Sequence, residues 1–432
     1  MSHIALIKLP WVMKDYIKRT YTGRLYNLAS RILKDNALPV LASFLLKHGY
    51  KASIHTIKRP EEIINIKADV YCFSLCTVDV PTFIETRRFI KKGKIILGGS
   101  HPSFDTSLLE YCDTIIIGEG ENGLLCALSD LTKGKMRKIY KKPCIENLDN
   151  LPRPVWEMMD RPNQVLTIIS SRGCRYRCSF CITSKLYNHT WRAMSPQRIL
   201  QEISPNRKKF VIFQDDNFTL STKRMWEFLR LKKEMGLNFK WFCFSRTDKI
   251  ARNPRLFEAM VDEGCTLIYV GIESASDAIL KSIKKGTTTQ INKTAIEILH
   301  DCGIGVWTSV MIGPNDTKET AHKLEEFCIW AEPYLHSTSI TTPFIGSDLF
   351  QDLDNQGRLL HKKWEFYDGG HCVFQPYHLS PAELESLTLQ VEESVWGSIG
   401  WHKRLLYFPK LLTKFLNKPY WYLTRRWWWG EW

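Results

Sequence analysis

The chain has 432 residues, of which 44% are apolar and 24% charged, with a net charge of +15 at pH 7. These proportions are typical of a globular protein and exclude a disordered one, and the length predicts two or three domains. The 13 cysteines lie at irregular spacings that predict no disulfide framework, and the chain shows neither a secretory leader nor an apolar run of about 18 residues, so we expect a cytoplasmic protein.

Residues 1–143 alternate short apolar runs with segments of helical periodicity. The predicted strands are His3–Leu9, Ala52–Ile57, Val70–Leu75, Lys94–Leu97 and Thr114–Ile117, and the predicted helices between them are Leu38–His48, Thr82–Lys92 and Gly123–Thr132. This alternation predicts an α/β fold, a Rossmann-like doubly wound sheet whose ligands lie at the carboxyl ends of the strands. Residues 11–36 fit no element of the pattern and are predicted to be an insertion.

Prolines 152, 154 and 162 fall in residues 144–163 and predict an inter-domain linker. A second alternating series follows over residues 164–345. Its predicted strands are Gln164–Ile169, Phe210–Phe213, Phe239–Phe244, Leu267–Gly271, Gly305–Ile312 and Ser337–Thr342, with helices at Ser195–Ile203, Thr222–Met235 and Thr289–Asp301. Six strands separated by helices predict a partial (β/α)6 TIM-like barrel, with its functional groups at the carboxyl ends of the strands.

Residues 346–432 lose this alternation and form a predicted C-terminal region with one helix, Pro381–Val395, and an aromatic, basic tail. The last 32 residues hold seven Lys and Arg against one acid, so the basic charge is concentrated locally and nucleic-acid binding is not expected. Trp and Tyr beside Lys and Arg fit either peripheral contact with a membrane surface or a cap that packs on the barrel.

Three cysteines, Cys174, Cys178 and Cys181, follow the first predicted barrel strand directly. Three thiolates in one loop bind three irons of a 4Fe-4S cluster and leave the fourth iron open. A structural zinc site is one alternative, but zinc takes four ligands and the next candidate, His189, lies eight residues beyond Cys181. Three buried structural thiols are another.

The cysteine spacing, its position after a strand, and Phe180 between the second and third cysteines resemble the radical S-adenosylmethionine (SAM) superfamily over residues of about 160–345. The resemblance implies that SAM binds the open iron and is cleaved to a 5′-deoxyadenosyl radical, with an electron donor such as flavodoxin or ferredoxin. It also implies SAM-binding roles for residues that follow the strands, namely Phe180, Asp216 (amino group), Arg246 (carboxylate), Glu273 (ribose) and Gly313 (adenine). A carboxylate at a strand end is equally suited to a structural ion pair.

The order of a Rossmann-like domain, a proline-rich linker and this barrel resembles the cobalamin-binding class of the superfamily. For that class the resemblance implies cobalamin contacts by residues after the third, fourth and fifth strands, namely Ser74, Thr77, Gly98, Gly99, Gly118 and Glu119. One departure is the absence from residues 1–60 of the Asp-x-His-x-x-Gly signature that replaces the lower cobalt ligand in mutases. His101 lies outside that context and is predicted to be a polar loop residue.

Joining both cofactors implies methyl transfer to an unactivated carbon or phosphorus of a small-molecule or lipid-like substrate. A radical SAM cyclase or oxidoreductase that transfers no methyl group is the alternative within this class. Transfer RNA methylthiolation would normally require three further clustered cysteines and a C-terminal RNA-binding barrel, and neither is apparent. A non-catalytic binding module would not need the cysteine triad together with polar groups at the strand ends.

Overall fold

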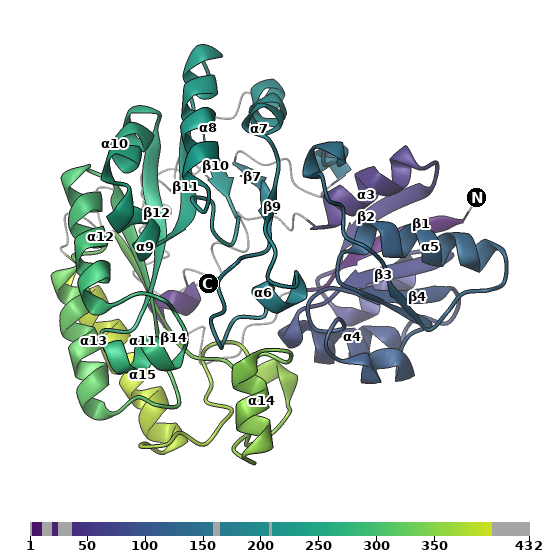
Figure 1. Cartoon of the computed structure of the whole chain (residues 1–432). Helices are drawn as coiled ribbons and strands as arrows, with labels where there is room; N and C mark the ends of the chain where they lie inside the picture. The colour runs from purple at the N-terminus through teal and green to yellow at the C-terminus, as the bar shows by residue number, and fades with distance from the viewer. Residues whose placement is uncertain (1, 11–19, 25–36, 159–164, 207–209, 400–432) are drawn as a thin grey trace, which may run out of the picture.

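The computed structural model describes residues 2–10, 20–24, 37–158, 165–206 and 210–399, and two six-stranded parallel sheets organise it. Figure 1 shows the N-terminal sheet with helices on both sides, and a second sheet whose helices lie along its outside. The architecture is the α/β arrangement predicted from the sequence. None of the helices in these described ranges is long and apolar enough to span a membrane.

The N-terminal sheet has the order β2-β1-β3-β4-β5-β6, with every neighbouring pair parallel. Its strands are β1 (His3–Lys8), β2 (Lys51–Thr56), β3 (Val70–Ser74), β4 (Lys94–Gly98), β5 (Thr114–Ile117) and β6 (Ile139–Lys141), and its main helices are α3 (Ala37–Lys47), α4 (Val80–Arg87) and α5 (Gly120–Thr132). The prediction of five strands was wrong by one, because β6 has three residues of which only Tyr140 is buried. Such a short edge strand shows no periodicity.

Each face of this sheet has its own apolar core, as a doubly wound sheet requires. Alternate residues of β1 show the division, since Ile4 and Leu6 pack with α3 and α5 while Ala5 and Ile7 pack with α4 on the other face. The strands are therefore apolar on both sides, which is the pattern that made them recognisable in the sequence.

The second sheet has the order β14-β13-β12-β11-β10-β7 and is also parallel throughout. Its strands are β7 (Leu166–Ile168), β10 (Phe210–Phe213), β11 (Lys240–Arg246), β12 (Cys265–Glu273), β13 (Gly305–Ile312) and β14 (Leu335–Ile340). Its helices are α7 (Pro196–Ile203), α8 (Thr222–Glu234), α9 (Thr247–Arg252), α10 (Pro254–Asp262), α11 (Asp277–Ser282), α12 (Thr289–Asp301) and α13 (Lys318–Trp330). β7 and β14 form opposite edges, so the sheet is a partial barrel.

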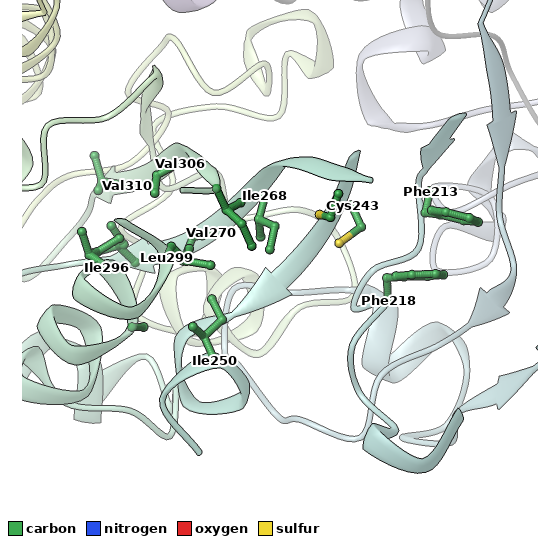
Figure 2. Packing of buried hydrophobic residues seen from close by; sticks show 14 of the residues in the cluster. Phe213, Phe218, Cys243, Ile250, Ile268, Val270, Ile296, Leu299, Val306 and Val310 are labelled. Atoms are coloured by element: carbon green, nitrogen blue, oxygen red, sulfur yellow. The ribbon is translucent and has the colours of Figure 1, made fainter. Parts of the chain in front are cut away.

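Aromatic packing behind the barrel sheet fixes the turn that follows β10. Phe213 and Phe218 stack with their ring centroids 4.1 Å apart, and both meet Phe228 and Trp241 edge to face. Figure 2 shows these two parallel rings and, on the other side of Cys243, aliphatic side chains of β12 and α12. Because both ends of the four-residue turn between Phe213 and Phe218 are held, the polar residues inside it have a defined place at the carboxyl end of β10.

In its described part, residues 20–24, the predicted insertion contacts the barrel strand β14, because the N–H of Thr338 donates to Thr22 Oγ1 at 3.2 Å. Tyr21 stacks on Trp396 of α15 (Pro381–Ser398) at 5.3 Å, and the backbone N–H of Thr22 donates to Glu392 Oε1 at 2.5 Å. These contacts join the N-terminal insertion to the C-terminal helix. The predictions for the Trp-rich tail concern residues 401–432, which lie outside the described residues.

A buried histidine in β14 makes folding stability depend on pH. His336 lies between the hydroxyls of Thr308 (2.8 Å) and Thr338 (2.6 Å), and burial lowers its pKa to about 3. The unfolded chain protonates near the ordinary pKa of about 6.5, so the stability that neutral His336 contributes is complete above that pH and declines below it. At pH 5 the loss should be about 2 kcal/mol.

Urea denaturation at pH 5 and pH 7 measures this loss. His336→Gln should reduce the difference between the two pH values, whereas His322→Gln on the surface of α13, where the side chain is 67% exposed, should not. Equal pH dependence in the wild type and His336→Gln would contradict the assignment.

Candidate active site

The three cysteines lie in one irregular loop at the carboxyl end of β7, just after the short strand β8 (Ser171–Arg172). All three side chains are half-buried. Gly173 opens the loop with φ of +85°, and a Cβ there would lie 2.3 Å from the carbonyl oxygen of Thr190. Ser179 holds the loop between Cys178 and Cys181, because its N–H donates to the carbonyl of Ile283 at 2.9 Å.

The loop fits a cluster better than a single ion. Burial raises the pKa of the Cys174 and Cys181 thiols, and each also feels the charge of another cysteine in the loop. Within the described residues, no three Cys, His, Asp or Glu side chains are arranged to share one metal ion. A 4Fe-4S cluster does not need its three cysteines to meet at one ion. Each of three irons binds its own thiolate, and sulfide fills the space between the irons. Iron binding to these thiols would release protons.

Arg246, the last residue of β11, supports the cysteine loop. Its guanidinium donates to Asp248 Oδ1 at 2.8 Å, lies 3.5 Å above the ring centroid of Tyr176, and has Nη1 3.7 Å from Cys178 Sγ. Tyr176 in turn donates to Asp248 Oδ2 at 2.5 Å. A SAM carboxylate contact by Arg246 stays a prediction, and Asp248 and Tyr176 are residues that the sequence analysis did not single out.

Glu273 ends β12 in a left-handed conformation, with φ of +66°, and its carboxylate pairs with Lys285 Nζ at 2.6 Å. Glu273 therefore forms the structural ion pair that was the alternative to a SAM contact, and its contact with the SAM ribose stays a prediction. Gly271 leaves room for the pair, because a Cβ there would lie 2.6 Å from Glu273 Oε1.

Glu273 and Gly313 line the same cavity of about 150 Å³. The N–H of Gly313 donates to Asp316 Oδ2 at 2.7 Å, and a Cβ at Gly313 would lie 2.7 Å from Thr341 Oγ1. Burial raises the pKa of Asp316, which faces this cavity, to about 6. The cavity is thus lined by a glycine and by polar groups. Phe180, which was also predicted to contact SAM, is half-buried and lines neither this cavity nor the larger one described next.

A cavity of about 360 Å³ lies where the carboxyl ends of the two sheets face each other. From the N-terminal sheet it is lined by residues after β3, β4 and β5, and from the barrel by residues after β7 and β10. Five of the six predicted cobalamin residues line it, namely Ser74, Gly98, Gly99, Gly118 and Glu119. The sixth, Thr77, is buried beside His101, with Oγ1 3.2 Å from the imidazole Nδ1.

Two adjacent aspartates after β10 have different environments. Asp215 is buried and accepts hydrogen bonds from the hydroxyls of Ser170 (2.9 Å) and Ser171, so it holds the start of the cysteine loop. Asp216 is open to the larger cavity and accepts from Thr183 Oγ1 at 3.2 Å. The surrounding protein raises the Asp216 pKa to about 6 by desolvation. Asp216 is thus placed to meet a ligand, and its predicted contact with the SAM amino group stays a prediction.

The sequence analysis did not predict the ion pairs that join the two sheets. Glu119 lines the larger cavity, but its carboxylate also pairs with Arg172 at 3.0 Å and with Arg192. The only available signal was the position of Arg172, two residues before Cys174. Arginine is common in exposed loops, so position alone could not predict a buried partner.

Residues 168–328 match the radical SAM superfamily. These residues therefore form a radical SAM domain, which indicates that the chain is an enzyme, and a domain of this kind implies a 4Fe-4S cluster and SAM. The chain is 28% identical to an uncharacterised methyltransferase of Pyrococcus horikoshii over 77% of this chain and 76% of the relative. It is 25% identical to bacteriochlorophyllide d C-8(2)-methyltransferase of Chlorobaculum tepidum, over 76% and 78%. An anaerobic magnesium-protoporphyrin IX monomethyl ester cyclase of Rubrivivax gelatinosus is 27% identical, over 75% and 65%.

Two solved structures share the fold over nearly all of this chain. The cobalamin-dependent SAM radical enzyme OxsB, with aqua-cobalamin and SAM bound, has a TM-score of 0.70 at 16% identity, covering 97% of this chain and 69% of OxsB. The radical SAM methyltransferase TsrM from Kitasatospora setae, with cobalamin and a 4Fe-4S cluster bound, has a TM-score of 0.67 at 13% identity, covering 94% and 90%. The fold of this chain is thus the fold of cobalamin-dependent radical SAM enzymes.

The close contact of Gly173 with Thr190 makes a specific prediction about the cysteine loop. Gly173→Ala should displace the loop, because it adds a clash to a left-handed backbone at a cost of about 2–3 kcal/mol. Iron and sulfide content after anaerobic reconstitution should fall well below the wild-type value. Gly236→Ala is the matched control, since Gly236 has φ of +62° but no atom within 4 Å of the added Cβ. Full iron content in Gly173→Ala would show that the loop tolerates the shift.

Proposed function

We propose that this chain is a cobalamin-dependent radical SAM methyltransferase that acts on a small molecule. The observation that carries the proposal is the glycine-lined cavity at which the carboxyl ends of both sheets meet, beside the cysteine loop. Methyl transfer is the activity named for two of the sequence relatives and for TsrM.

The cavity wall fits a flat ring that approaches the backbone. A Cβ at Gly98 would meet only the carbonyl of Ile116, at 3.9 Å, and one at Gly118 would meet nothing within 4 Å. Side chains at these two positions would therefore project into the cavity. Gly99 serves the turn itself, because its φ is +101° and a Cβ would lie 2.5 Å from the backbone of Leu75. Ser74 and Ser100 add small polar groups to the same wall.

The residues of this chain would hold and separate the reactants. When bound, the cluster and SAM supply the 5′-deoxyadenosyl radical, and cobalamin supplies the methyl group. Cys174, Cys178 and Cys181 would hold the cluster, while Asp216 faces the cavity where an ammonium group of SAM could be bound. Leu38, Leu41, Trp156 and Met194 give the cavity apolar walls, which exclude water from reactive intermediates.

The same apolar walls support a lipid-like or flat polycyclic substrate as the finer proposal. A one-electron donor such as flavodoxin or ferredoxin is required by the chemistry, since SAM cleavage consumes an electron. Peripheral membrane contact through the basic Trp-rich tail remains a proposal that rests on its composition alone.

A cyclase or oxidoreductase is the second candidate function, favoured by the similarity to the Rubrivivax gelatinosus cyclase. The products distinguish the two. A methyltransferase that restores its methyl donor from SAM forms S-adenosylhomocysteine beside 5′-deoxyadenosine, whereas cyclisation forms no S-adenosylhomocysteine.

The direct test is anaerobic purification followed by absorbance spectroscopy and chromatography of SAM products. With hydroxocobalamin and a reductant, the enzyme should show iron–sulfur and corrin bands and form both S-adenosylhomocysteine and 5′-deoxyadenosine. Formation of 5′-deoxyadenosine with neither corrin nor S-adenosylhomocysteine would contradict methyl transfer and leave radical chemistry intact.

Filling the glycine-lined wall tests the cobalamin site without touching the cluster. Gly98→Leu should weaken hydroxocobalamin binding about a hundredfold, because its side chain would occupy the cavity at a backbone conformation that leucine tolerates. Gly98→Ala is the control and should bind nearly as the wild type does. Equilibrium titration followed by corrin absorbance measures both. Unchanged binding in Gly98→Leu, at normal iron content, would place the corrin elsewhere.

A further inference from the structure

Four charged residues form a buried cluster between the two sheets, which we call the interdomain clamp: Glu119, Glu121, Arg172 and Arg192. Glu119 precedes α5 as its N-cap and Glu121 lies in the first turn of α5. Arg172 and Arg192 face each other in the antiparallel pair of β8 and β9 (Arg192–Ala193). One side of the clamp thus belongs to the N-terminal sheet and the other to the cysteine loop.

The contacts of the clamp are close and its side chains are 4–15% exposed. Arg172 divides its guanidinium between two carboxylates, with Nη1 3.0 Å from Glu119 Oε2 and Nη2 2.6 Å from Glu121 Oε1. Arg192 pairs with Glu119 and also donates to the carbonyl of Ile145. The N–H of Ile145 donates back to Glu119 Oε2 at 3.1 Å.

Charge balance makes the clamp rigid. Arg172 pairs with both Glu119 and Glu121, and Arg192 pairs with Glu119. The carboxylates also lie at the N-terminus of a 13-residue helix, where the helix dipole favours negative charge. Two cations and two anions therefore neutralise each other, and removing one charge leaves its partner buried without compensation, which is costly.

The clamp is adjacent in sequence to the cysteine loop on one side and to the cavity wall on the other. Arg172 lies two residues before Cys174, and the residue between them, Gly173, is packed against Thr190. On the other side, Glu119 stands between Gly118 and Gly120, and all three line the larger cavity. A displacement of α5 would consequently move the cysteine loop and the glycine-lined wall relative to each other.

We propose that Arg172 is a positioning residue that, through the interdomain clamp, sets the separation between the cluster loop and the glycine-lined cofactor wall. This rests on the proposed function for the identity of the two cofactors. The residue does not contact the reacting atoms, and its effect is on the distance between the two sites.

The first experiment measures that distance. In frozen, reduced enzyme holding both cofactors, cob(II)alamin and the reduced cluster each carry an unpaired spin, and their dipolar coupling reports their separation. The wild type should give one narrow distance distribution, and Glu121→Gln should broaden it at least about twofold at unchanged iron and corrin content. Arg172→Lys keeps the charge but cannot bridge two carboxylates, so the width of its distance distribution should lie between those of the wild type and Glu121→Gln. Glu234→Gln, which breaks the exposed pair with Arg230, is the control and should match the wild type.

The second experiment does not need cobalamin. Hydrogen exchange of the cluster-reconstituted enzyme should be about tenfold faster in Glu121→Gln than in the wild type, both in peptides spanning residues 118–124 and in peptides spanning 170–181. Peptides from α12 should be unchanged. Faster exchange confined to residues 118–124, or a distance distribution equal to that of the wild type, would overturn the clamp. Failure to bind any corrin would contradict the methyltransferase proposal. The hydrogen-exchange result would still decide the role of Arg172.

Discussion

Parallel strand pairing is the constraint on which the rest of this structure depends. Because all strands of a parallel sheet point the same way, the loops at their carboxyl ends gather at one edge. Both sheets of this chain are parallel throughout, and their carboxyl edges face the same cavity. The cysteine loop, the glycine turns after β4 and β5, and Asp216 are neighbours only because of this arrangement.

Charge pairing then separates the polar residues of these edges into two groups. Arg246 is engaged by Asp248, Glu273 by Lys285, and the clamp carboxylates by Arg172 and Arg192. These pairs offset the cost of removing charges from water and hold the loops in place. Asp216 and Asp316 face the two cavities instead, and desolvation raises the pKa of each to about 6. Raised carboxyl pKa values at cavity walls are more typical of ligand-binding groups than of structural pairs.

The sequence predicted most strands to within a residue or two, because buried parallel strands are short, β-branched and apolar on both faces. The N-terminal sheet lacked only β6, whose single buried side chain gives no pattern. The residues that line the larger cavity were also largely predictable, since Gly98, Gly99 and Gly118 follow strands directly. The position of residues 20–24 was not predictable, because Thr22 and its partner Glu392 are 370 positions apart in the sequence.

The sequence by itself determined the cysteine triad, the order of the strands and helices along the chain, and hence the class of enzyme. These depend on residues that are close in the chain, whose spacing no folding event can change. Only the tertiary structure decided which charges are paired. Arg172 and Glu121 are separated by 51 positions, and Arg192 and Glu119 by 73. Such contacts exist only after the two sheets dock, because burial between the sheets both raises the cost of an unpaired charge and selects its partner.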